Sequence, residues 1–304
     1  MMKINIANET GKLSVVIVGI ADDFGGTPKL EECYDPKSRT HVIAGTYPVE
    51  KDCVFEMSAL VDVFEKHGVD VFRPRNINRL NQIFSRDIAF VIADKLVLPN
   101  IIKSRKEEVS AIDDLISQIP SELILRMPAE ARVEGGDVIP WNECIFVGYS
   151  EAEDFEKYMV ARTNRAGLDF LTVVFLTKKI KGFELNKSDI DPRENALHLD
   201  CCFQPIGKNS AIIYKGGFKN EADINFLVHY FGAENIIEIS KEEMYDMNAN
   251  VFSISEQVII SEKGFTRLNA ELRKRGFIVE EVPYAEIAKM EGLLRCSTIP
   301  LIRE

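Results

Sequence analysis

Four segments of this chain repeat one pattern, in which a polar residue opens two short apolar runs separated by polar residues. The opening residues are Asp87, Asp137, Asp200 and Asn250. After Asp87, for example, the two apolar runs flank the turn-like residues 93–95. Short runs rich in β-branched and aromatic residues around a polar centre are typical of β-hairpins. The pattern therefore predicts four hairpins.

The segments after the hairpins also recur. Helix-compatible apolar spacing follows each of them, at residues 104–118, 151–170, 220–231 and 264–275. A short apolar strand tends to come next, at 123–125, 236–239 and 277–279. The hairpin openings lie 50, 63 and 50 residues apart, and such regular spacing indicates a repeat architecture.

The two ends of the chain supply a fifth unit. We predict strands at 13–20 and 69–72 with a helix at 54–67 between them, completed by the C-terminal segment 293–302. No Pro-, Gly- or Ser-rich stretch marks a linker, so we expect a single α/β domain over 1–304. The alternative is an ordinary α/β sheet. If the units instead surround an axis, their openings converge on one polar pocket, formed by Asp87, Glu134, Asp137, His198, Asp200 and Asn250.

Composition narrows the classes of partner. The net charge of −11 argues against nucleic acid as a partner, because nucleic acid needs clustered Lys and Arg, and it slightly favours a cationic ligand.

The apolar runs are too short to cross a bilayer, and the first residues lack the apolar stretch of a signal peptide. The six cysteines form no CxxC pair and the four histidines are scattered, so we expect no metal site. We expect a cytoplasmic protein, and a homo-oligomer is left open.

Four motifs resemble a known superfamily. They are Phe84-Ser85-Arg86-Asp87, Glu134-Gly135-Gly136-Asp137, His198-Leu199-Asp200 and Gly292-Leu293-Leu294-Arg295-Cys296-Ser297-Thr298. In this order they are similar to the motifs of the guanidino-group-modifying enzymes, or penteins, which include arginine deiminase, dimethylarginine dimethylaminohydrolase and the amidinotransferases. The resemblance implies a five-bladed, pseudo-symmetric α/β propeller, in agreement with the repeat.

The resemblance implies a nucleophile, an acid–base group and its partner. Cys296 matches the nucleophile, and a resonance-stabilised guanidinium carbon calls for a thiolate. His198 matches the general acid–base, and Glu134 matches the carboxylate that orients it. For a cysteine or a histidine taken singly, a structural role is the common alternative.

The remaining matches concern the substrate. Asp87 and Asp200 match the two carboxylates that clamp a guanidinium through paired hydrogen bonds, although an aspartate at a strand start is often a turn residue. Arg105 and Arg162 resemble the arginines that hold a substrate α-carboxylate, and either one could instead be a solvated helix residue. Cys201 and Cys202 are expected to fill the core.

We therefore expect a hydrolase of a small cationic guanidino compound, arginine or a close relative, that works through a covalent thiouronium-type intermediate without metal or cofactor. An amidinotransferase, which passes the amidino group to an amine, is the alternative within the superfamily. A non-catalytic binding protein of the same fold is the alternative from another class, and the presence of Cys296, His198 and Glu134 argues against it.

Overall fold

The computed structural model describes residues 2–304 and arranges them as five three-stranded sheets. In every sheet two strands pair antiparallel, and the third strand pairs parallel to the central one. The sheets are β15 (Thr298–Arg303), β1 (Leu13–Val18) and β2 (Asp70–Phe72); β3 (Phe90–Ile92), β4 (Lys95–Leu98) and β5 (Ile124–Arg126); β6 (Val138–Trp141), β7 (Cys144–Tyr149) and β8 (Lys179–Glu184); β9 (Phe203–Ile206), β10 (Ser210–Ile213) and β11 (Ile236–Glu238); and β12 (Phe252–Ser253), β13 (Val258–Glu262) and β14 (Ile278–Val282).

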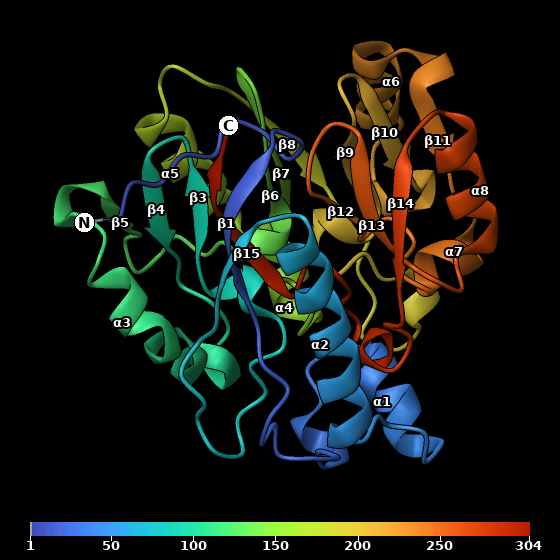
Figure 1. Ribbon diagram of the computed structural model, residues 1–304. Coiled ribbons are helices and arrows are strands. Elements are labelled where there is room, and N and C mark those ends of the chain that lie inside the picture. The colour runs from blue at the N-terminus through green and yellow to red at the C-terminus, as the bar shows by residue number, and fades with distance from the viewer. Residues whose placement is uncertain (1) are drawn as a thin grey trace.

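Helical segments connect the central strand of each sheet to its parallel neighbour, because parallel strands need a crossover. These connections are α2 (Glu50–Lys66), the 3-10 helix η3 (Lys103–Ile112) with α3 (Asp113–Ile116), α4 (Ala152–Lys157) with α5 (Arg165–Val174), α6 (Glu221–Phe231) and α8 (Thr266–Lys274). Of the two further helices, α1 (Pro36–Ile43) precedes α2 in the same connection, and α7 (Lys241–Tyr245) lies between β11 and β12. In Figure 1, α3 lies at the left, α6 lies at the top right and α8 lies at the right edge, outside the sheets. Within residues 2–304, no helix is long and apolar enough to cross a membrane.

The predicted repeat and its closure are confirmed. Each of the four hairpins is the antiparallel pair of one sheet. The fifth sheet combines both ends of the chain, because β1 pairs antiparallel with β15 and Leu13 lies opposite Arg303. Figure 1 shows the blue β1 beside the red β15. The fold is the five-bladed, pseudo-symmetric α/β propeller expected from the sequence.

Two predicted helices differ from the structure. Most of the 104–118 segment is the 3-10 helix η3, in which residues three apart eclipse one another, and there Arg105 donates to Glu108. The 151–170 segment is interrupted between α4 and α5. Asn164 begins α5 as its N-cap by accepting a hydrogen bond from the Gly167 amide at 2.8 Å, which ends any continuous helix and allows Arg162 to turn inward.

Short 3-10 turns stand immediately before three of the innermost strands. They are η2 (Ser85–Ile88), η5 (Gly135–Asp137) and η7 (Leu199–Cys201), which precede β3, β6 and β9. Every residue of these three strands is buried, since each strand packs between neighbouring sheets. The turns are therefore fixed by the apolar core that follows them, and their polar side chains meet near the axis.

Candidate active site

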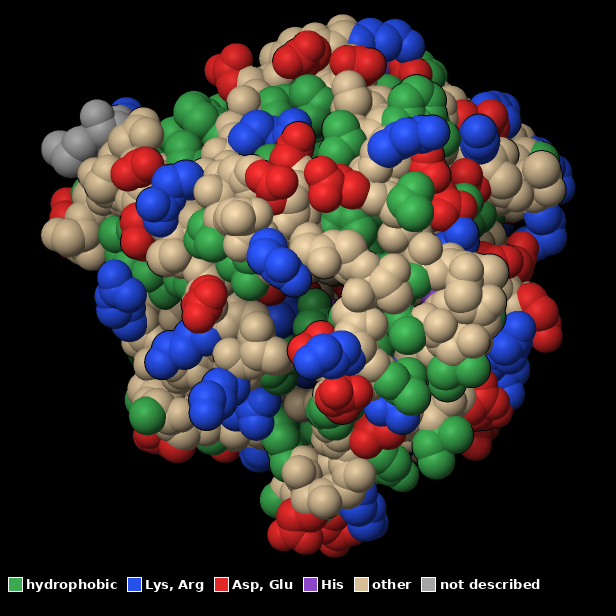
Figure 2. Space-filling view, turned by 90° about the horizontal axis from the view of Figure 1, so that it is seen from below, with side chains coloured by type: hydrophobic (Ala, Val, Ile, Leu, Met, Phe, Trp, Pro, Cys, Tyr) green, Lys and Arg blue, Asp and Glu red, His purple; other side chains and the backbone are tan. Residues whose placement is uncertain are grey.

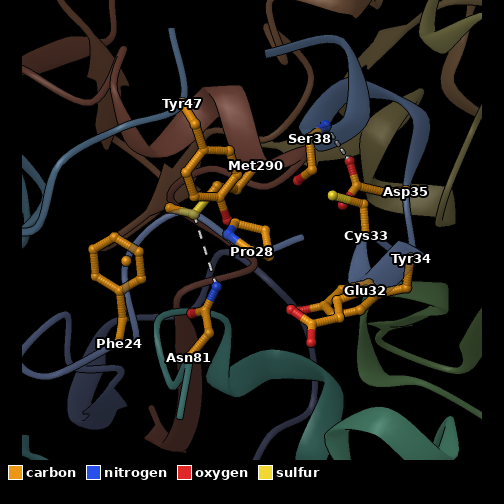
Figure 3. A pocket seen from close by; sticks show the side chains of 11 residues that line it. Phe24, Pro28, Glu32, Cys33, Tyr34, Asp35, Ser38, Tyr47, Asn81 and Met290 are labelled. Atoms are coloured by element: carbon orange, nitrogen blue, oxygen red, sulfur yellow. Dashed lines mark hydrogen bonds between the residues drawn. The ribbon is translucent and has the colours of Figure 1, made fainter. Parts of the chain in front are cut away.

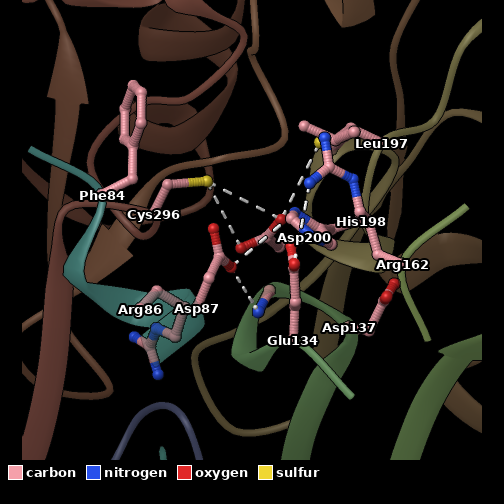
Figure 4. A network of polar contacts seen from close by, with 12 residues as sticks. Phe84, Arg86, Asp87, Glu134, Asp137, Arg162, Leu197, His198, Asp200 and Cys296 are labelled. Atoms are coloured by element: carbon pink, nitrogen blue, oxygen red, sulfur yellow. Dashed lines mark hydrogen bonds and ion pairs between the residues drawn. The ribbon is translucent and has the colours of Figure 1, made fainter. Parts of the chain in front are cut away.

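The residues that open the hairpins do converge. Asp87 lies in η2, Glu134 and His198 are the N-cap residues of η5 and η7, and Cys296 precedes β15. Asn250 precedes β12. All five are buried, with exposed fractions of 3% or less. Figure 4 shows Asp87, Glu134, His198 and Cys296 around one small space.

His198 lies between two carboxylates. Its Nε2 is 2.9 Å from Oε2 of Glu134, and its Nδ1 is 3.8 Å from Oδ1 of Asp87. Burial alone would lower the pKa of this imidazole, but the charge of Asp87 and the hydrogen bond with Glu134 outweigh burial and raise the pKa to about 9. His198 is therefore an imidazolium at neutral pH and can act as a proton donor.

Glu134 is held in its ionised form. Burial would raise the pKa of this carboxyl, but Arg162 and the hydrogen bond with His198 shift it well below its usual range. Its Oε1 lies 3.6 Å from Nη1 of Arg162 and accepts a hydrogen bond from the Ile102 amide at 3.2 Å. Glu134 thus has the contacts needed to orient the His198 ring.

Cys296 is positioned by Asn250. The side-chain oxygen of Asn250 accepts a hydrogen bond from the Cys296 amide at 3.1 Å. The side-chain nitrogen of Asn250, Nδ2, lies 3.2 Å from Sγ of Cys296. Burial raises the pKa of this thiol well above its usual value, and the carboxylates of Asp200 and Asp87 raise it further. The resting group is therefore a thiol. A cation placed between the two carboxylates would remove their repulsion and favour the thiolate.

Asp87 and Asp200 each have one oxygen held by an arginine. Arg105 donates to Oδ2 of Asp87 at 2.5 Å, and Arg295 donates to Oδ2 of Asp200 at 2.8 Å. Oδ1 of Asp87 faces His198 and accepts a hydrogen bond from the Gly136 amide at 3.1 Å. Both oxygens of Asp200 lie near Sγ of Cys296, Oδ1 at 3.9 Å and Oδ2 at 3.7 Å. Two carboxylates near one thiol suit a flat cation with several N–H groups.

The two arginines predicted to hold a substrate carboxylate have protein partners. Arg105 donates to both oxygens of Glu108 at 2.8 Å as well as to Asp87. Arg162 donates to the Tyr34 carbonyl at 2.7 Å and faces Glu134, and only its Nε lacks a partner among residues 2–304. Both side chains line the cavity, and their role toward a substrate stays a prediction.

Sequence reasoning missed two residues that organise the site. Asn250 was predicted to lie among the converging residues that open the hairpins, but its hydrogen bonds with Cys296 were not predicted. For Arg295, the sequence indicated no role beyond its place next to the predicted nucleophile. Its guanidinium is fully buried and donates to Asp200, to both oxygens of Glu9 and to the Val138 carbonyl. No spacing pattern in the sequence connects Glu9 with Arg295. The one signal is that Arg295 is a charged residue next to an apolar strand, which indicates that it needs a buried partner.

The residues of the site enclose a cavity of about 20 Å³. The candidate catalytic residues Glu134, His198 and Cys296 line it, and so do Tyr34, Asp35, Met290 and Glu291. Helix α1 lies at the bottom of Figure 1, and Figure 2 looks onto that face from below. Over the described residues this face has no broad cleft, so the site is covered in this structure.

Asp87, Glu134 and His198 offer potential metal ligands within 4.8 Å of one another. Their contacts favour an ion-pair network instead. The imidazole is protonated between the two carboxylates, and metal binding needs a neutral ring. Arg105 and Arg162 supply further positive charge. We therefore keep the expectation that no metal is needed.

Comparison with known proteins places the chain among guanidino-modifying enzymes. A family model described as "N,N dimethylarginine dimethylhydrolase, eukaryotic" matches residues 45–303. The uncharacterized protein YkgA of Bacillus subtilis is 31% identical over 248 residues, which are 81% of this chain and 79% of YkgA. The N(G),N(G)-dimethylarginine dimethylaminohydrolase of Pseudomonas aeruginosa is 25% identical over 65% of this chain and 67% of its own length.

Solved structures share the fold. SxtG, an amidinotransferase from Microseira wollei, matches with a TM-score of 0.77 at 18% identity, over 99% of this chain and 97% of its own. A dimethylarginine dimethylaminohydrolase adduct matches with a TM-score of 0.70 at 18% identity, over 94% and 99%. The family model covers most of the chain, and the four motifs converge in a pentein fold. This chain belongs to the dimethylarginine dimethylhydrolase family of the pentein superfamily, whose members act on guanidino groups.

Proposed function

We propose that this protein is a cysteine-dependent hydrolase of a guanidino compound. The observation that carries the proposal is the convergence, around one cavity, of the Cys296 thiol, the His198–Glu134 pair and the Asp87 carboxylate, with the Asp200 carboxylate 3.7 Å from Sγ of Cys296. A thiol, a proton donor and a two-carboxylate cation site are the groups that substitution at a guanidinium carbon needs.

The reaction proceeds in two halves. A guanidinium between Asp87 and Asp200 favours transfer of the Cys296 thiol proton to solvent water, and Sγ of Cys296 then forms a bond to the guanidinium carbon. His198 gives its proton to one nitrogen, the carbon–nitrogen bond breaks, and ammonia or an amine leaves. A positively charged thiouronium remains on the cysteine. Water then adds to the same carbon while His198 accepts a proton, and the carbon–sulfur bond breaks to release a ureido product and the thiol.

The first experiment separates hydrolysis from amidino transfer, because both share the first half. Arginine and related guanidino compounds are incubated in oxygen-18 water, with and without glycine, ornithine or lysine, and products are followed by mass spectrometry. We expect one label in the ureido oxygen and no new guanidino compound. Product that forms only with an added amine would instead assign the chain as an amidinotransferase.

The second experiment tests the acid role of His198. The imidazolium must be present for leaving-group departure, so kcat/KM is expected to fall as pH rises through about 9. Glu134→Gln removes a charge that stabilises the imidazolium, and the alkaline limb should move down by roughly one pH unit or more. Profiles from about pH 6 to about pH 10.5 give the comparison. The matched control is Glu130→Gln, four residues earlier and exposed. An alkaline limb at the same pH in both variants would contradict this role.

A further inference from the structure

A groove outside the active site lies at the ends of β4 and β5, between η3 and the loop that follows β5. Its volume is about 680 Å³, which suits a small organic molecule. The chamber beside the active site, drawn in Figure 3, has only about 90 Å³. Among residues 2–304, none lines both the groove and the active-site cavity, so the groove is a separate feature.

The 3-10 helix η3 forms one wall of the groove. Residues three apart in such a helix lie in one row, and Lys103, Lys106 and Val109 all line the groove. Arg105 and Glu108 form a second row, which is buried, and Arg105 donates from there to Asp87 of the active site. The helix therefore presents its lysines to the groove and its buried arginine to the catalytic network.

The opposite wall comes from β5 and the loop after it. Arg126 is the last residue of β5, and Arg132 lies in the loop. The side chain of Asn100, in the loop after β4, donates to the carbonyls of Pro128 at 2.7 Å and Ala131 at 2.9 Å. These hydrogen bonds fasten the two loops to each other, so the shape of the groove is set before a ligand binds.

The groove is positively charged, although the chain carries a net charge of −11. Among residues 2–304, no acidic side chain lines it, whereas four basic ones do: Lys103, Lys106, Arg126 and Arg132. Within the same residues, none of the four side chains forms an ion pair or a hydrogen bond. Glu108 and Glu134 pair instead with Arg105 and Arg162. The arrow of β4 points down in Figure 1, and Figure 2 shows basic side chains gathered at the left of that lower face.

The groove also offers apolar surface, because Leu98, Ile101, Val109 and Met127 line it beside the cations. Four like charges around one groove repel one another, and an anion bound between them removes this repulsion. A bare inorganic ion leaves the apolar surface in water, whereas an organic anion can bury its carbon body there. The two kinds of wall together therefore favour an anion that has an organic body.

We infer that this groove binds a small organic anion with two or more negative charges. Its charged groups, phosphates or carboxylates, pair with the lysines of η3 and with the arginines of the opposite wall. Its carbon body packs on the apolar surface. The inference goes beyond the proposed hydrolysis and does not depend on it, because the groove and the active-site cavity have separate linings.

The test measures binding by calorimetry in metal-free buffer, with ATP, inorganic triphosphate, adenosine and citrate as probes. We expect ATP, which combines phosphates with a flat organic body, to bind with a Kd below about 100 μM. Triphosphate lacks the body and should bind at least about tenfold more weakly. Adenosine lacks the charge and should not bind measurably. Citrate that binds more tightly than ATP would uphold the site and assign its ligand as a carboxylate.

The variant Lys106→Gln/Arg126→Gln removes one charge from each wall and should weaken ATP binding at least about 30-fold. The matched control is Lys51→Gln/Lys263→Gln, which removes two charges outside the groove and should leave Kd within about twofold. All four residues are exposed, and thermal unfolding checks that the fold is kept.

Three results would overturn the inference: no binding of ATP or citrate below about 1 mM, equal binding to the groove variant and the control, or triphosphate that binds as tightly as ATP. Anion binding that depends on the groove residues, in a protein that converts no guanidino compound, would uphold the inference and overturn the proposed hydrolysis alone.

Discussion

Replacing Cys296 by serine is expected to lower turnover of a guanidino substrate by at least about 10⁴-fold. The hydroxyl is nearly isosteric with the thiol and can keep the Asn250 contact, but it is a much weaker nucleophile toward a resonance-stabilised carbon. The loss should appear in kcat, since the carboxylates that bind the guanidinium remain. Initial rates of ureido product formation, with calorimetric binding of the same substrate, separate the two effects.

Cys144→Ser is the matched control for this loss. Cys144 is also buried, but it lies in β7 and contacts the Tyr230 hydroxyl rather than the site. Its replacement should leave turnover within a few-fold of the wild type. A Cys296→Ser protein that kept a tenth of the activity would show that another group attacks the substrate.

An unmethylated guanidinium is expected to react at least about 100-fold more efficiently, in kcat/KM, than the same compound dimethylated on one terminal nitrogen. Asp200 is fully buried, and its Oδ1 lies near Sγ of Cys296 without an arginine partner. A terminal NH₂ can donate to this oxygen, whereas a dimethylated nitrogen offers no N–H. Leaving this buried carboxylate unpaired would cost several kcal/mol. A hundredfold loss of efficiency corresponds to about 3 kcal/mol, which lies within that cost.

A series with no, one and two methyl groups measures this preference. The monomethyl compound keeps one N–H and should fall between the other two. The outcome matters because the matching family is described by its dimethylarginine activity, while the His198-Leu199-Asp200 motif resembles that of arginine deiminases and amidinotransferases. Faster conversion of the dimethylated compound would place this chain with the activity in the family's description.

The fold was predictable because four of the five units are local. A hairpin, a helical connection and a returning strand lie within about sixty residues, and their alternation and turn residues are visible in the sequence. The strand β8 was missed, since Lys179 and Lys181 interrupt its apolar character. The 3-10 form of η3 was missed as well, because its backbone is set by the buried Arg105 contacts rather than by apolar spacing.

The site was predictable to the extent that repeats place equivalent residues together. Asp87, Glu134 and His198 therefore converge as expected, and Cys296, which the family motif singled out, lies beside them. The partners of the charges were not predictable, since ion pairs such as that of Arg295 with Glu9 join positions without a shared pattern. The cover over the cavity was missed for a related reason: the segment around Asp35 has no apolar period that would place it.

The sheet formed by both chain ends also sets the order in which the protein can fold. Four sheets use strands close in sequence, whereas β1 and β15 must bring Leu13 to Arg303. Closing so long a loop costs about 5 kcal/mol of chain entropy, so this pairing is expected to form late. Cys296 lies just before β15, and its Asn250 contact depends on that placement. Nascent or partly folded chains would therefore carry a thiol without its partners, and chemistry would begin only when the ring is complete.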